Sequence, residues 1–285
     1  MKKSCFLFVV LICFFSSSLV FSQEKAKPEV SFSSGAGYMS DDSGNGSFQY
    51  VVGGVNFVKD NYLIGPFFNF TNVGVEFGGY KLTAQEITLG PNFAIWGDLS
   101  DKFQYSAWLA PGMKYFSDHG KNNNLTEEAW QEDWGLYGIS GVNISDKDNR
   151  WFRNYKLQLQ YQKNIVSSRR GTWTQGENIT DSINVKAVNK AYFKTQFEIV
   201  VKKINLGKKG RFEPKLVVSY LYDSGAKKSA FEYGSGVAIS FSRGSRYFEA
   251  FSLQYRARYD LEFADRLDLV EIGVDFVNLY KLLIK

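Results

Sequence analysis

Polar and apolar residues alternate without a break over residues 151–164, which read WFRNYKLQLQYQKN. The stretch is longer than most strands of soluble proteins, which usually run to about five or six residues. On one side an apolar pair is framed by two tyrosines and then by two cations, the depth profile of a strand that crosses a bilayer. The other side would face a wet lumen with Phe152, Asn154, Lys156, Gln158, Gln160, Gln162 and Asn164.

Segments with the same alternation recur along the chain, and no linker, low-complexity tract or change of composition separates them. Their connections alternate between short and long, as they do when tight turns gather at one end of a barrel and loops at the other. To keep the loop over 117–133 at the end with the long loops, residues 62–96 must form two long strands that turn near Gly78 and Gly79. The predicted strands are 31–40, 47–58, the two within 62–96, 103–116, 134–145, 152–164, 191–203, 212–222, 231–242, 247–259 and 267–280.

The fold class that follows is all-β, a transmembrane antiparallel up-and-down β-barrel of about 12 strands. Beyond residue 22 no apolar run approaches the ~20 residues of a transmembrane helix. A membrane protein without helices must be a closed barrel, because only closure pairs every backbone group in lipid. A secreted soluble β-protein is the alternative. Glycines fall on both faces of the early strands, so the register within residues 31–97 stays open.

The N-terminus has the pattern of a secretory signal peptide. Lys2 and Lys3 precede an apolar run over 5–15, and Val20 and Ser22 occupy the −3 and −1 positions of a cleavage site. This predicts a signal peptide over 1–22 and one barrel domain over 23–285. A lipoprotein acylated on Cys13 and a retained signal anchor are the alternatives.

The positions of the cysteines exclude several kinds of site from the mature protein. The chain has two cysteines, Cys5 and Cys13, and both lie in the predicted signal peptide. The mature protein would therefore have no thiol, which excludes disulfides, zinc–thiolate sites and cysteine nucleophiles. No metal-ligand spacing, phosphate loop or nucleotide fingerprint is present, so we expect no metal or cofactor.

The alternating strands, the aromatic bands and a last strand that reads EIGVDFVNLY resemble the bacterial outer-membrane β-barrel superfamily, with no specific family indicated. Glu271, Gly273 and Phe276 suit the assembly signal of its final strand, although the chain departs from it by running on through 281–285. The resemblance implies a monomer in the bacterial outer membrane, with both ends periplasmic. Its partners would be lipid, lipopolysaccharide and the barrel-assembly machinery.

Catalysis would depend on a single histidine. His119 stands in SDHGKNNN, within a predicted loop over 117–133, and such a position favours a solvated side chain. The carboxylate pairs Asp41–Asp42 and Glu127–Glu128 would lie on the rim, where charges are common. We therefore expect that the protein is not an enzyme.

The lumen carries the charged candidates. Arg256 and Arg258 would point inward and could form a ladder that selects anions, since fixed cations favour anion entry into a narrow pore. The alternative, which we favour, is that they pair with Glu271 and Asp275 on the neighbouring strand and fill the barrel. The inward candidates are Lys156, Lys194, Lys202, Lys215, Arg256, Arg258, Glu198, Glu213, Glu232, Glu271 and Asp275.

Two long loops could contact a ligand. The first contains Trp130 beside an acidic run, and the second, over 167–189, begins with Arg169, Arg170 and Trp173. These loops could fold inward as a constriction or present a sugar-binding aromatic side chain. Surface decoration is the more frequent use of such loops.

The function predicted from the sequence is a porin-like channel for small polar or anionic solutes. The alternative is a non-conducting barrel that serves as a structural or assembly partner in the envelope or a secretion system. An outer-membrane enzyme acting through His119 is the third candidate. Removal of Lys2 and Lys3 would lower the formal charge from +5 to +3, too little to decide between them. No feature indicates nucleic-acid binding.

Overall fold

The structure of this chain is a computed structural model. It describes residues 27–40, 44–77, 80–122, 127–172, 191–207, 210–224, 227–243, 246–261 and 266–283. The predicted signal peptide over 1–22 lies outside the described residues.

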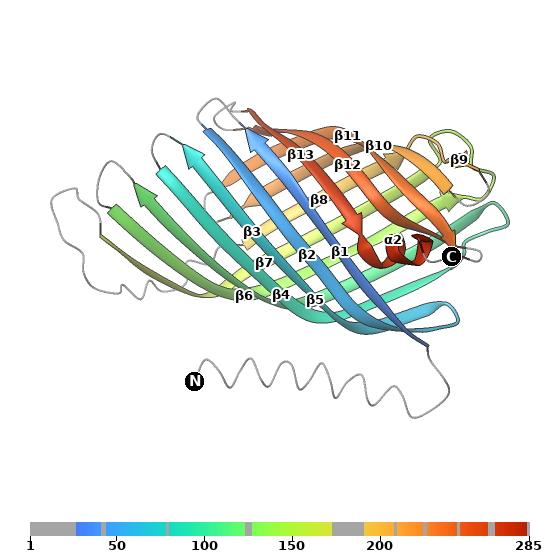
Figure 1. The fold of residues 1–285 in the computed structure, drawn as a ribbon, viewed down its shortest axis with the longest axis horizontal. Helices are drawn as coiled ribbons and strands as arrows, with labels where there is room; N and C mark the ends of the chain where they lie inside the picture. Colours follow the sequence, from blue (N-terminus) through green and yellow to red (C-terminus); the bar gives the residue numbers. More distant parts are fainter. Residues whose placement is uncertain are drawn as a thin grey trace.

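Nearly all of the described chain is β-strand, followed by one C-terminal helix (Figure 1). The elements are β1 (Lys27–Ser40), β2 (Gly44–Lys59), β3 (Tyr62–Phe77), β4 (Tyr80–Asp98), β5 (Phe103–Asn122), β6 (Glu127–Asp146), β7 (Asn154–Thr172), β8 (Ala191–Val200), β9 (Ile204–Leu206), β10 (Gly210–Asp223), β11 (Lys228–Arg243), β12 (Arg246–Asp260), β13 (Arg266–Asp275) and α2 (Phe276–Leu283). The described residues contain no helix long and apolar enough to cross a membrane.

The strands form one closed antiparallel barrel. Each pairs with its neighbours in the sequence, and β1 closes the sheet by pairing with β13. The short β9 continues the line of β8 along β10, so β8 and β9 together count as one strand of the barrel. The described strands therefore form a 12-stranded barrel, as predicted, and the two long strands expected within residues 62–96 are β3, which ends at Phe77, and β4, which begins at Tyr80.

The predicted inside and outside of the barrel are confirmed on β7. Tyr155, Leu157, Leu159 and Tyr161 point outward, and each exposes between 37% and 43% of its surface. The alternate polar residues line the interior. An apolar outer surface with a polar interior is the arrangement that lipid outside and water inside require.

The two ends of the barrel differ. The connections β2–β3, β4–β5 and β6–β7 lie at one end, with the start of β1 and the end of β13; we call this the turn end. The opposite end, where residues 173–190 join β7 to β8, we call the loop end. The strands β5, β6 and β7 reach furthest at the loop end (Figure 1).

The predicted loop over 117–133 was wrong, because most of it is strand. Residues 117–122 belong to β5 and pair with 127–132 of β6. β7 likewise continues to Thr172, past the predicted strand end at Asn164. The sequence signal was lost there because both faces of a hairpin outside the bilayer meet water, so apolar alternation is no longer needed.

The last strand also ends earlier than predicted. β13 stops at Asp275, and Phe276 begins α2, which packs against the outside of β1 with the rings of Phe32 and Phe276 6.0 Å apart. β1 pairs with β2 from Lys27 onward but with β13 only over Ser33–Ser40. α2 therefore lies where β1 has lost its β13 neighbour.

All five prolines of the chain, Pro28, Pro66, Pro91, Pro111 and Pro214, lie in strands. Pro66 and Pro91 face each other across β3 and β4, and the β4–β5 ladder is interrupted beside Pro91 and Pro111. The backbones approach closely there, since a Cβ on Gly90 would lie 2.0 Å from the carbonyl oxygen of Pro111. Because proline cannot donate a hydrogen bond, this region of the wall has fewer ladder bonds.

Phe276→Ala is expected to lower the free energy of unfolding by about 1 kcal/mol, because an aromatic pair contributes on that order. Urea unfolding of the refolded barrel in detergent measures the change. Tyr280→Ala is the control, since Tyr280 lies on the same helix and is 64% exposed. Equal effects of the two substitutions would contradict a specific contact between α2 and β1.

Candidate functional site

Two cavities occupy the interior of the barrel. One, of about 820 Å³, lies at the turn end and is lined from β4, β5, β6, β7, β8, β10, β11 and β12. The other, of about 650 Å³, lies toward the loop end. We call them the turn-side cavity and the loop-side cavity. Their walls contain many charged residues, and the two differ in how those charges are satisfied.

Glu232 is the centre of an ion network beside the loop-side cavity. Its side chain is fully buried, and it accepts from Lys194 Nζ at 2.8 Å and from Arg258 Nη2 at 2.6 Å. Arg256 Nη1 lies 3.6 Å from the same carboxylate. One carboxylate from β11 thus contacts cations from β8 and β12, which stabilises three charges that would otherwise be costly inside the barrel.

The network continues around the wall. Arg256 Nη2 donates to Glu271 Oε2 at 2.6 Å, and the Tyr50 hydroxyl donates to Glu271 Oε1 at 3.0 Å. Across the cavity Lys114 pairs with Glu86 at 2.9 Å and donates to Gln162. Polar contacts therefore follow the lumen wall on both sides of the loop-side cavity.

The pairing differs in part from the one predicted. Arg256 does pair with Glu271 of β13. Arg258 instead pairs with Glu232 of its other neighbour, β11, whereas Asp275 lies opposite Ser33 where β13 meets β1. A role of these residues in selecting solutes stays a prediction.

A β-bulge explains why Glu232 was not predicted as the partner. The β11–β12 register shifts by one residue between Ile239 and Ser240, which places Glu232 opposite Arg258. Without that shift, the tight Arg243–Arg246 turn would place Ala257 opposite Glu232. Bulges change which face a side chain occupies, and the sequence gives little sign of them.

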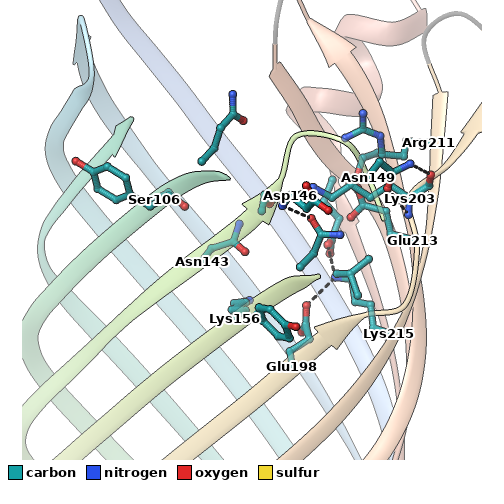
Figure 2. A pocket seen from close by; sticks show the side chains of 18 of the residues that line it. Ser106, Asn143, Asp146, Asn149, Lys156, Glu198, Lys203, Arg211, Glu213 and Lys215 are labelled. Carbon is teal, nitrogen blue, oxygen red and sulfur yellow. Dashed lines mark hydrogen bonds and ion pairs between the residues drawn. The ribbon is translucent and has the colours of Figure 1, made fainter. Parts of the chain in front are cut away.

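The turn-side cavity has an aromatic wall and a charged wall. Trp96 and Trp108 line it from β4 and β5. On the other side Lys215 Nζ lies 2.8 Å from Glu249 Oε2 and 3.5 Å from Glu198 Oε1. Figure 2 shows the charged side chains of Lys203, Arg211, Glu213 and Lys215 to one side of the cavity and Ser106 to the other.

Three further lysines line this cavity, Lys147, Lys156 and Lys203, of which Lys147 pairs with Asp98 at 3.0 Å. Lys156, which was predicted to face the lumen, places Nζ 5.7 Å from the centre of the Trp108 ring. Lys203 Nζ donates to Ser145 Oγ at 3.0 Å. The predicted inward residue was Lys202, which instead lies over the Trp151 ring at 4.7 Å. The strand β8 stops at Val200, so its alternation does not reach these lysines.

The β6–β7 turn forms the edge of the turn-side cavity. Asp146 accepts from Arg150 Nε at 2.9 Å and from the amides of Asp148 and Arg150. The Arg150 hydrogen bond, which is the largest influence, and these amides lower the pKa of Asp146. Phe152 has a positive φ of 55°, and β7 begins at Asn154 and not at Phe152 as predicted.

Among the predicted loop residues, the structure describes the side chain of Trp130, which does not face the lumen. Trp130 lies on the outer side of β6 and stacks on His119 with ring centres 4.9 Å apart. Arg169 and Arg170 lie in β7, paired in register with Gln131 and Trp130. Trp173 lies outside the described residues. A ligand role for this set stays a prediction.

His119 Nε2 lies 3.9 Å from Glu128 Oε2, on the long β5–β6 hairpin. In the part of the chain that the structure describes, no group of three or more histidine, cysteine, aspartate or glutamate side chains is placed to hold a metal ion.

Comparison with known proteins bears on the fold. No protein-family model and no curated protein sequence matches the chain. Among solved structures, the translocator domain of the autotransporter NalP from Neisseria meningitidis is 11% identical, with 96% of each chain covered and a TM-score of 0.51. The chain has the fold of a bacterial outer-membrane β-barrel.

Two further outer-membrane barrels are similar at the same level. The β domain of the Bordetella autotransporter Brka is 12% identical, covers 88% of this chain and 99% of its own, and has a TM-score of 0.50. The transport unit of AIDA-I from Escherichia coli is 12% identical, with 90% and 91% covered and a TM-score of 0.50. At these identities the likeness concerns the outer-membrane barrel fold alone.

Glu232→Gln is expected to destabilise the outer-membrane barrel by about 3–5 kcal/mol, because it leaves buried cations without their carboxylate. Denaturant unfolding in detergent measures the loss. Glu76→Gln, a change at an exposed position of β3, is the control and should have little effect. A wild-type unfolding curve for Glu232→Gln would contradict the central role of this carboxylate.

The β6–β7 turn is expected to loosen in acid. Because the folded pKa of Asp146 is lowered, its contribution is complete above the ordinary aspartate pKa of about 3.9 and is lost as pH falls through the lower folded value. Amide exchange of Asp148 and Arg150, corrected for intrinsic rates, should accelerate there. Asp146→Asn should give fast exchange at neutral pH, and Asp101→Asn in the β4–β5 turn should not.

Proposed function

We propose that this chain is an outer-membrane channel for small polar solutes, with its turn end and both termini in the periplasm. The main observation in support is that two cavities with polar linings, of about 820 and 650 Å³, lie inside a barrel whose outer face is apolar. The orientation rests on the general rule that such barrels place tight turns in the periplasm. Lipid, lipopolysaccharide and the barrel-assembly machinery are the partners that this location implies.

The ion network limits the selectivity that we propose. Arg256 and Arg258 contact Glu232 and Glu271, so their charges are largely neutralised at the wall. This pairing favours weak selectivity at the loop-side cavity over a strong anion ladder. The proposal includes no catalytic role, since His119 lies beside Trp130 on the outer side of the β5–β6 hairpin.

A non-conducting barrel that serves as a structural or assembly partner is the second candidate. The same ion network supports it, because paired side chains of Lys194, Glu232 and Arg256 extend into the lumen and stiffen the wall. The two candidates differ in whether ions cross the refolded barrel, which is directly measurable.

Single-channel recording in a planar bilayer under a salt gradient tests the proposal. The wild type should conduct with a reversal potential near zero. Arg256→Ala/Arg258→Ala should shift the reversal potential toward cation preference, because Glu232 and Glu271 would lose their counter-charges. Lys102→Ala, at an exposed position in the β4–β5 turn, is the control. A folded barrel that never conducts would favour the second candidate.

A further inference from the structure

We infer that the turn-side cavity binds a monocarboxylate carried on a six-membered ring, and that Lys156, Lys203 and Asn154 hold the carboxylate. The inference deepens the proposed function and rests on it only for how the solute reaches the cavity. The site differs from Arg256 and Arg258, for which the sequence left anion selection as the less favoured of two readings.

The first observation is a pair of cations without carboxylate partners. Among the residues that the structure describes, neither Lys156 nor Lys203 has a carboxylate oxygen within 4.0 Å; their contacts are the Trp108 ring and the Ser145 hydroxyl. Lys215 in the same cavity, by contrast, lies between Glu198 and Glu249. Neither ammonium group therefore forms an ion pair, although the Glu213 carboxylate acts on Lys203 from a longer distance.

The second observation is a buried donor without an acceptor. Asn154 is only 1% exposed and lines the turn-side cavity. Its Oδ1 accepts from the Asp146 amide at 3.2 Å, which fixes the orientation of the side-chain amide. Its Nδ2 has no hydrogen-bond partner among the described residues. Since a buried unpaired donor costs free energy, an acceptor from a ligand would stabilise it.

Two of these donors follow each other on β7, and the third reaches the strand beside them. Lys156 follows Asn154 by two residues on the same face of β7, which separates their Cα atoms by about 7 Å. Ser145, the contact of Lys203, is the register partner of Asn154 on β6. The Asn149 side chain also bonds both the amide and the carbonyl of Lys203. The donors are therefore held in place before any ligand binds.

The ring is inferred from the two tryptophans that line the cavity. Trp96 and Trp108 line the cavity, and Lys156 lies over the ring of Trp108. A carboxylate at Lys156 would thus place the rest of a small molecule against the indole. Flat or puckered six-membered rings pack well on such a face.

The Glu213 carboxylate is expected to weaken the binding of an anion in the turn-side cavity. It lines the same cavity from β10, on the side of Lys203 (Figure 2). Its negative charge would oppose a bound anion, whereas the other nearby carboxylates, Glu198, Glu249 and Asp146, already contact Lys215 or Arg150. Neutralising Glu213 should therefore strengthen binding, while neutralising either lysine should weaken it.

Isothermal titration of the refolded barrel in detergent, where both ends meet solvent, tests binding without conduction. Benzoate and glucuronate are the probes, and benzyl alcohol and glucose are their uncharged counterparts. Binding of either carboxylate should weaken about tenfold in Lys156→Gln and in Lys203→Gln, as expected for loss of one charged hydrogen bond. It should tighten in Glu213→Gln and stay unchanged in Lys102→Gln, a control at an exposed turn position.

The contrast between benzoate and glucuronate tells whether the ring is aromatic or a sugar. Acetate should bind more weakly than both, because it has no ring to contact Trp108. Equal binding of the charged and uncharged compounds, or no effect of the two lysine substitutions in a folded barrel, would overturn the inference. Carboxylate binding by a barrel that does not conduct would support the inference and refute the channel.

Discussion

Backbone hydrogen bonding is the constraint on which this structure depends. A strand in lipid has no water to satisfy its amide and carbonyl groups, so every strand needs two neighbours. The β1–β13 pairing meets that need where the first strand lies beside the last. It is incomplete at the turn end, where β13 gives way to α2 and the first residues of β1 keep only β2 beside them. The helix therefore lies at the least complete part of the closed sheet.

Closure of the barrel has a second effect, because every second side chain of each strand then points into a confined interior. Charges placed there must be paired or exposed to water. The loop-side cavity uses pairing, with Glu232 fully buried among Lys194, Arg256 and Arg258. The turn-side cavity leaves Lys156 on an aromatic ring instead. The two halves of one lumen thus present different chemistry to whatever enters.

The alternation of polar and apolar residues was enough to predict the two faces of β7, because successive side chains of a strand point to opposite sides. The alternation of short and long connections was enough to predict the number of strands. Several local features escaped prediction, and three of them show why. The helix α2 has an apolar sequence that fits a strand equally well, and the extended β5–β6 hairpin is polar on both faces. The partner of Arg258 depends on a one-residue bulge, whose position is set by packing across β11 and β12.

The prolines have a consequence for how quickly the barrel can form. None of the described peptide bonds is cis, so all five X-Pro bonds must be trans before their strands can pair. In an unfolded chain each such bond is trans in about 70–90% of molecules, so roughly 0.2 to 0.6 of the chains have all five correct. The remainder must wait for isomerisation, which takes tens to hundreds of seconds at 25 °C. Assembly of the barrel therefore starts from a mixture of chains, only some of which have every proline ready to join the sheet.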